Sequence, residues 1–343
     1  MTGNSATSTA TYIEETTDQE GAGFAQTYLT PGAGVLYALL NTVLSATASQ
    51  FMSLGSQAGI PGLQLMFLTK FGETLAVLLF LPFFRPKLTT ENGRQTLLMV
   101  LSTITENLGA IFQYMSFVFV VPGIAFGIIK GSMPLASACL SFLFLEETVG
   151  VVDCFGIVLN VAGVVVVAYG LITENTSSTQ RLTASILLPL AATFGRAPSL
   201  VIARSLIGVQ KVSVLTVLFY ANLPGAVVLL GLTYLFETPI WAMSAQTVGY
   251  VIGLCLCVCG SHFATKLSLK TEKAGITATI KTFTIPLTVL LDYVVLSELP
   301  SPLKSGGVVL IMFGTGVVTV YTWWRHRKET LHKNFMQSLD FDK

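Results

Sequence analysis

The chain has 343 residues, of which 52% are hydrophobic and only 11% are charged; its mean hydropathy is +0.71 and its net charge is +1. Soluble domains carry about 25% charged residues, so the composition excludes an ordinary soluble domain and predicts a protein embedded in the lipid bilayer. Apolar runs of about 20 residues, each long enough to cross a bilayer, recur along the chain, and nothing in the charge pattern suggests a nucleic-acid partner.

Ten membrane helices are predicted in chain order. The first 32 residues are polar and acidic, without the basic start of a cleavable signal peptide, and we expect a disordered tail there. The third and fourth helices are separated only around Pro122, so one long helix is the alternative at that point. A basic tail is expected at 325–343. The predicted spans are 33–54, 63–84, 96–118, 122–144, 151–172, 183–203, 212–236, 246–267, 275–296 and 304–324.

The basic residues of the loops predict the orientation. An even number of passes puts both termini on one side, and Lys and Arg are concentrated in cytosolic loops. Asn175 begins an Asn-Thr-Ser glycosylation acceptor in a loop on the opposite side. We therefore expect both termini to be cytosolic, with plasma membrane and endomembrane undecided. Ten basic residues fall on the predicted cytosolic side (Arg85, Lys87, Arg94, Arg204, Lys211, Lys270, Lys273, Arg325, Arg327, Lys328) and two on the other (Arg181, Lys304).

The two halves of the chain repeat one another. The segment GIAFGIIKGSMPLASACLSFLFLEE matches GITATIKTFTIPLTVLLDYVVLSE with a constant offset of 152 residues, from Gly123 and Gly275 through Pro134 and Pro286 to Glu146 and Glu298. After a gap of one residue, Gly156 pairs with Gly307 and Gly163 with Gly314. Because five passes are an odd number, the second half must enter the membrane upside down, which is a recurring plan of secondary transporters. The predicted fold is an all-α membrane protein of ten transmembrane helices in two inverted five-helix repeats, 33–172 and 183–324.

Two of these motifs resemble a known family. A fourth helix that ends in FLFLEE, followed by the glycine-spaced helix GIVLNVAGVVVVAYG, is similar to the end of an EamA repeat, and VVLSELPSPLKSGGVVLIMFGTGVVTVY repeats it more loosely. Over about residues 33 to 324 the chain resembles the drug/metabolite transporter superfamily, near the G branch of solute carrier family 35. The sequence SELP departs from the FLxE-type ending and weakens the equivalence of the halves. The resemblance implies transport of a small polar solute and names none in particular.

A lysine precedes the proline in both matched segments. Lys130 lies four residues before Pro134, and Lys281 lies five before Pro286. Proline deprives a carbonyl one turn earlier of its partner, so we expect a weakened helix at both places. A charge at the centre of a membrane helix costs at least ~2.5–3.5 kcal/mol, and broken segments in corresponding positions of two halves point to a transport site. We therefore predict substrate binding by the two lysines; the alternative is that they pair with buried carboxylates and only hold helices together.

Other polar residues fall inside the predicted passes. Lys70 and Glu73 are three apart on one helix face and predict an ion pair. Glu106 is a candidate counter-ion of Lys130 or a proton carrier. His262 is a candidate for coupling, although a lone histidine in an apolar helix is more often a core residue. The remaining candidates are Arg196, Asn107 and Gln113 for substrate binding and Asp292 for a structural or gating pair.

The basic candidates (Lys70, Lys130, Arg196, Lys281) outnumber the acidic ones (Glu73, Glu106, Asp292), which predicts a small organic anion, a carboxylate or a phosphate, as substrate. A carrier working by alternating access is favoured. A non-transporting membrane partner and a carrier of a neutral or cationic solute are the alternatives. No nucleotide-phosphate loop, HExxH or GxSxG motif is present, so we expect no enzyme, cofactor or metal. The seven-residue spacing of the glycines predicts a close helix contact, either within the scaffold or between two copies in a homodimer.

Overall fold

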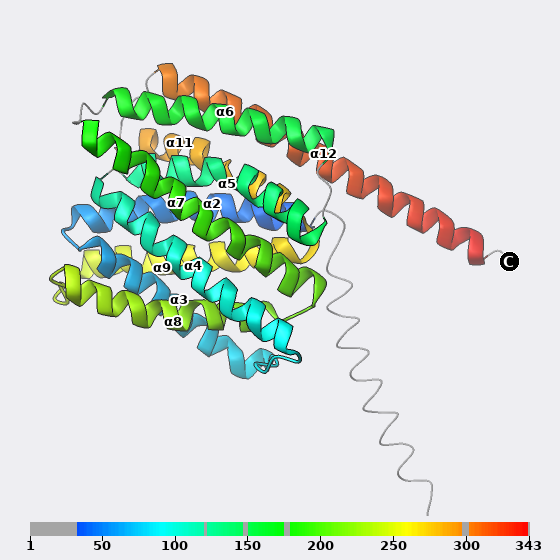
Figure 1. Cartoon of the computed structure of the whole chain (residues 1–343), viewed down its shortest axis with the longest axis horizontal. Helices are drawn as coiled ribbons and strands as arrows, with labels where there is room; N and C mark the ends of the chain where they lie inside the picture. The colour runs from blue at the N-terminus through cyan, green and yellow to red at the C-terminus, as the bar shows by residue number, and fades with distance from the viewer. Residues whose placement is uncertain (1–32, 120–121, 147–149, 175–178, 297–301, 342–343) are drawn as a thin grey trace, which may run out of the picture.

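A computed structural model describes residues 33–119, 122–146, 150–174, 179–296 and 302–341, and every regular element in these ranges is helical. The elements are α2 (Ala33–Gln57), α3 (Gly62–Phe84), α4 (Gly93–Phe119), α5 (Pro122–Leu145), α6 (Val151–Glu174), α7 (Thr179–Arg204), the π-helical turn η1 (Ser205–Val209), α8 (Val214–Phe236), α9 (Ala245–Thr271), α10 (Ala274–Lys281), α11 (Thr284–Leu296) and α12 (Pro302–Phe341). They form one bundle (Figure 1).

The distribution of apolar side chains is that of a membrane protein. Large apolar residues such as Phe83, Phe144 and Leu235 are exposed on the outside of the bundle, whereas many of the buried side chains are threonines, serines and asparagines. Seven of the described helices are long and apolar enough to cross a bilayer. Helices α4 and α7, which carry Glu106, Gln113 and Arg196, are not among those seven.

The third and fourth predicted spans are separate helices, because α4 ends at Phe119 and α5 begins at Pro122. Proline is favoured at the first position of a helix, where its missing N–H is no loss. Helix α12 continues beyond the predicted end of its span, since residues 325–341 extend the same helix instead of leaving it as a separate tail. Figure 1 shows this red end of α12 projecting past the other helices.

The two prolines of the matched segments behave differently. Helix α10 ends at Lys281 and α11 begins at Thr284, two residues before Pro286, so this segment is interrupted. The Thr282 hydroxyl holds the interruption, because it lies within hydrogen-bond distance of Asn160 Oδ1 on α6 (3.0 Å) and Thr315 Oγ1 on α12 (3.1 Å). The predicted break at Pro134 is wrong: α5 runs through it without interruption.

Two serine hydroxyls near Pro134 donate to carbonyls of their own helix, that of Ser132 to Ile128 (2.6 Å) and that of Ser137 to Pro134 (3.2 Å). Neither of these bonds is to the carbonyl of residue 130, which Pro134 deprives of its helical donor. A proline inside a membrane helix is tolerated where its surroundings satisfy the freed backbone group.

Four packing relations organise the bundle. Helix α2 lies along α9, α4 along α7, α3 along α8, and α6 along α12. Figure 1 shows the α6–α12 pair on one edge of the bundle and the α3–α8 pair on the opposite edge. The glycines of the predicted close contact lie in the α6–α12 seam, within one chain. A Cβ atom on Gly163 would lie only 2.8 Å from the Gly307 carbonyl oxygen, and one on Gly314 only 2.9 Å from the Gly156 carbonyl oxygen.

This seam yields a stability prediction. Gly163→Leu forces a side chain against the backbone of α12 at Gly307 and Ile311, which cannot move aside cheaply. We expect a loss of about 1–3 kcal/mol, the usual cost of overpacking, and a lower melting temperature of the detergent-solubilised protein. Gly316→Leu is the matched control, because Gly316 lies on the same seam helix with open space at its Cβ position. Equal melting temperatures for the two variants would contradict the assigned seam.

Candidate functional site

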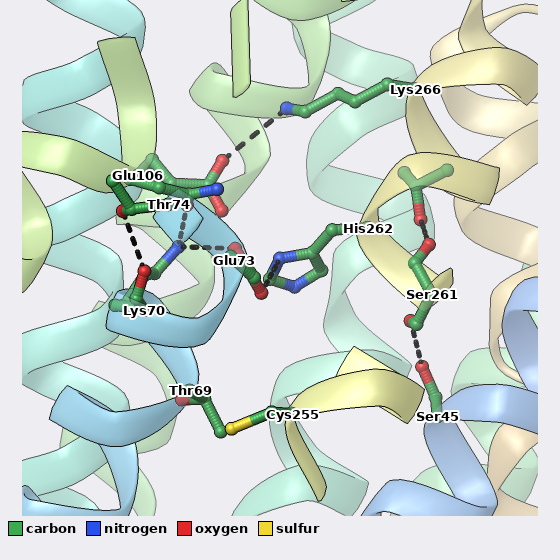
Figure 2. Close-up of polar contacts among 12 residues, drawn as sticks. Ser45, Thr69, Lys70, Glu73, Thr74, Glu106, Cys255, Ser261, His262 and Lys266 are labelled. Atoms are coloured by element: carbon green, nitrogen blue, oxygen red, sulfur yellow. Dashed lines mark hydrogen bonds and ion pairs between the residues drawn. The ribbon is translucent and has the colours of Figure 1, made fainter. Parts of the chain in front are cut away.

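A chain of polar side chains crosses the interior of the bundle from α8 through α3 to α9. Lys70 Nζ on α3 donates to Asn222 Oδ1 on α8 at 2.8 Å and lies 3.7 Å from Glu73 Oε2, the pair that the three-residue spacing predicts. The other carboxylate oxygen, Oε1, lies 2.8 Å from His262 Nδ1 on α9. Figure 2 shows Glu73 between Lys70 and His262. Lys70 and Glu73 are both buried, so their charges compensate each other out of reach of lipid.

Glu106, on α4, is the centre of a second cluster. Its Oε2 accepts a hydrogen bond from the Ser199 hydroxyl on α7 at 2.6 Å and lies 3.7 Å from Lys266 Nζ on α9. Figure 2 shows Lys266 directed toward Glu106. Glu106 thus forms an ion pair with Lys266, a partner that the sequence analysis did not name; its pairing with Lys130 stays a prediction.

Lys266, Asn222 and Ser199 were absent from the sequence-based candidates. Lys266 could have been found, because it follows His262 by four residues and so shares its helix face. Its position at the end of the predicted span 246–267 does not by itself indicate a buried partner, because lysines there usually reach the interface. Asn222 and Ser199 are common polar residues, and nothing local in the sequence distinguishes them.

Glycines bring α4 and α7 close together beside this cluster. A Cβ atom on Gly195 would lie 2.6 Å from Gly109 Cα, and one on Gly109 would lie 2.8 Å from the backbone nitrogen of Arg196. The crossing places Arg196 near Glu106, one turn before Gly109. The Arg196 Nε is buried and makes no hydrogen bond to any described residue.

Three cations come together from separate helices. Lys130 on α5 is close enough to Lys281 and Arg196 for their charges to interact, and Lys281 likewise interacts with Arg196, Lys266 and Glu106. Lys281 occupies the last position of α10, at the interruption described above. The structure thus brings the predicted lysine pair, Lys130 and Lys281, together with Arg196 in one positively charged region (the cation region) next to the Glu106 cluster.

The remaining candidates fall outside this region or outside the described residues. The Asn107 side-chain nitrogen donates to the carbonyls of Thr103 (2.8 Å) and Ala221 (3.1 Å), so it ties α4 to α8. Gln113 is buried, and its Oε1 has no hydrogen-bond partner in the described part of the chain. The Asp292 side chain and Asn175 are not among the described residues. Within the described ranges no group of three His, Cys, Asp or Glu side chains could hold a metal ion, and the five cysteines are free thiols.

Comparison with known proteins agrees with this architecture. The EamA-like transporter family matches residues 32–169. This confirms the resemblance to EamA-type drug/metabolite transporters. The chain is also 24% identical over 309 residues to mouse solute carrier family 35 member G1, covering 87% of this chain and 81% of that protein. A solved structure described as "Crystal structure of protein" has a TM-score of 0.72 and 17% identity over 85% of this chain and 98% of its own, a likeness of fold alone.

The EamA region supplies α2 to α6, so the polar clusters join it to the rest of the chain. Lys70, Glu73, Glu106 and Lys130 lie within residues 32–169, whereas Arg196, Asn222, His262, Lys266 and Lys281 lie beyond it. Every ion pair between helices described above therefore links the EamA region to the second half.

The Lys266–Glu106 pair predicts a measurable coupling. Removing one partner from a buried pair leaves an uncompensated charge, so Lys266→Met and Glu106→Gln should each lower stability by up to about 3–5 kcal/mol. The double variant should lose clearly less than the sum, measured as thermal unfolding in detergent through a double-mutant cycle. Lys87→Met, an exposed loop lysine, is the control. Additive losses would show that the two side chains do not interact.

Proposed function

We propose that the protein is a membrane carrier of a small organic anion, a carboxylate or phosphate-bearing metabolite, which binds at the cation region. The membrane-transporter character follows from the EamA match and the apolar helices. The observation that carries the substrate class is the charge balance of the described clusters: five basic side chains (Lys70, Lys130, Arg196, Lys266, Lys281) stand against two carboxylates (Glu73, Glu106). Both carboxylates already have a lysine partner.

The chemistry of the cation region suits an anion. Mutual repulsion of Lys130, Lys281 and Arg196 disfavours their close approach unless negative charge lies among them, since a low-dielectric interior screens like charges poorly. Arginine offers a planar fork of donors for a carboxylate or phosphate, and lysine a compact point charge. The unpartnered Arg196 Nε is a donor that such an oxygen would satisfy.

Alternating access by two inverted halves is the mechanism we propose, with ten passes and both termini in the cytosol. Contacts that share the 152-residue offset support it. Lys70 and Asn222, which bond directly, differ by 152 positions. The Gln64 side chain pairs with Ile240, accepting from its N–H at 2.8 Å and donating to its carbonyl at 2.6 Å. The equivalent position of the second half, Thr216, donates to the Lys87 carbonyl at 3.0 Å.

These two contacts would close opposite ends of the carrier. In the first, the start of α3 holds the loop between α8 and α9; in the second, the start of α8 holds the loop between α3 and α4. The α6–α12 seam has the same reciprocity, with Gly156 against Gly314 and Gly163 against Gly307. An inverted repeat requires such paired contacts, because whatever joins one half to the other at one membrane face recurs at the opposite face.

The proposed substrate class is tested by flux. Purified protein in liposomes is assayed with labelled succinate, glycerol 3-phosphate, UDP-glucose, choline and glucose. We expect saturable uptake and counterflow of at least one anion. Arg196→Met, Lys130→Met and Lys281→Met should each raise KM by ~10–100-fold, because a hydrogen bond to a charged group contributes about 1.5–3 kcal/mol.

Arg94→Met, at an exposed position near the start of α4, is the control and should transport normally. Transport of choline or glucose that survives all three substitutions would make the cations structural and refute the anion. Folded protein that moves none of the five compounds, and shows no counterflow, would favour a membrane partner without transport.

A cross-linking experiment tests the alternation. Cysteines at positions 64 and 240, in a background without the five native cysteines, are joined by a short bifunctional reagent that reduction cleaves. We expect flux to stop on cross-linking and to return after reduction, because that end of the carrier must open in each cycle. Cysteines at positions 216 and 87 should behave in the same way. Undiminished flux in both cross-linked proteins would exclude these contacts as gates.

A further inference from the structure

The contact between Glu73 and His262 joins a fully buried acid to a partly exposed base. The Glu73 side chain is 2% exposed, whereas that of His262 is 25% exposed. Neither carboxylate oxygen of Glu73 accepts a hydrogen bond of good geometry from any described residue, so its charge depends on Lys70 and His262. The ionised form of this carboxylate is therefore stabilised by the two neighbouring bases and not by a set of fixed hydrogen-bond donors.

The contact with Glu73 favours one form of the neutral imidazole. Nδ1 lies 2.8 Å from a carboxylate oxygen, which can only accept, so we assign the hydrogen of the neutral ring to Nδ1. Nε2 is then left with the lone pair. A hydronium ion can transfer a proton to Nε2: an O–H bond of hydronium breaks, an N–H bond to the ring forms, and water is released. The product is an imidazolium next to the Glu73 carboxylate.

We propose that the Glu73–His262 pair is a proton-binding site and that the carrier moves one proton together with each anion. This inference rests on the proposed function and names its co-substrate. The imidazole supplies the proton acceptor, and Glu73 supplies the fixed negative charge that balances the imidazolium.

The surroundings of the pair contain several other charges. Glu73 is close enough to Lys70 and Glu106 for their charges to interact, and Glu106 interacts with Lys266, Arg196 and His262 itself. Cys255 and Cys259, on the same helix as His262, also lie within electrostatic range of Glu73. Helix α2, which packs along α9, has Tyr37 as its one ionisable side chain. Helix α8, which packs on α3, has Tyr220 and Tyr234. Lys281 on α10 belongs to the cation region and interacts with Glu106.

These charges connect proton uptake to anion binding. The network of Glu106, Arg196 and Lys281 links the Glu73–His262 pair to the cation region. A proton added at His262 raises the positive charge of that network, which favours a bound anion. Thermodynamic linkage is reciprocal, so a bound anion also favours the proton. Coupling of this sign makes the carrier a symporter of anion and proton.

The test measures protons and anions together. Liposomes loaded with the pH-sensitive dye pyranine, with the membrane potential clamped by valinomycin and potassium, receive an inward gradient of succinate, glycerol 3-phosphate or UDP-glucose. We expect acidification inside, absent from protein-free liposomes, and an apparent anion affinity that increases by up to about tenfold per unit of falling pH. His262→Gln and Glu73→Gln should abolish acidification and the pH dependence. Glu91→Gln, at an exposed loop carboxylate, should change neither.

The possible outcomes distinguish proton coupling from the anion transport on which it depends. Anion flux without acidification in the wild type overturns the coupling alone. Acidification that persists in both substituted proteins shows that the proton binds elsewhere, which overturns the assigned site. Absence of flux for every anion overturns the proposed anion transport, and the coupling with it.

A spectroscopic measurement keeps the site testable if the variants lose transport by misfolding. With His326 and His332 replaced by glutamine, isotope-labelled His262 in nanodiscs is the one histidine seen by NMR. We expect its ring signals to change reversibly over the same pH range as the anion affinity in the flux assay, and Glu73→Gln to move the midpoint of that change. Ring signals that stay constant over this range would overturn the proton site.

Discussion

A charge inside the bilayer has to be compensated by protein, and this requirement determines how the helices of this chain pack. Glu73 pairs with Lys70, which also bonds to Asn222 on α8. Glu106 pairs with Lys266, which shares a face of α9 with His262, the second partner of Glu73. Leaving any of these charges to lipid would cost at least ~2.5–3.5 kcal/mol. The pairs therefore hold α3, α4, α8 and α9 in one arrangement, together with the apolar clusters between α3, α8 and α9.

Much of the helical pattern could be predicted from the sequence, because apolar length and loop charge are local properties. The Lys70–Glu73 pair and the reciprocal glycines of the α6–α12 seam follow from spacing. Partners far apart in the chain could not be predicted in this way. The Ser199–Glu106 bond spans 93 residues and depends on how closely α4 and α7 approach at Gly109 and Gly195. The same limit explains the proline error: whether a helix breaks depends on what its neighbours offer, and the hydroxyl of Thr282 finds Asn160 on another helix.

The buried charged side chains occur in two kinds of surroundings, called here two kinds of place. Along α3, α4 and α9 each carboxylate has a basic partner at short distance. Between α5, α7 and α10 three cations come together, with Glu106 as a carboxylate within electrostatic range of Lys281 and Arg196. We propose that an anion from outside the chain adds further negative charge at the second place. Our proposals for the anion and for the proton follow from this division, and Glu106, which interacts with both places, connects them.

Helix α12 has a mechanical consequence. Its 40 residues extend over ~60 Å, about twice the hydrocarbon thickness of a bilayer. The part that packs against α6 and the part that projects from the bundle belong to one uninterrupted rod. A rod transmits tilt along its whole length, so a small rotation at the α6–α12 seam becomes a displacement of several ångströms at Phe341. A label or binding protein attached there acts as a lever arm on the seam, and can both report on its rotation and restrain it.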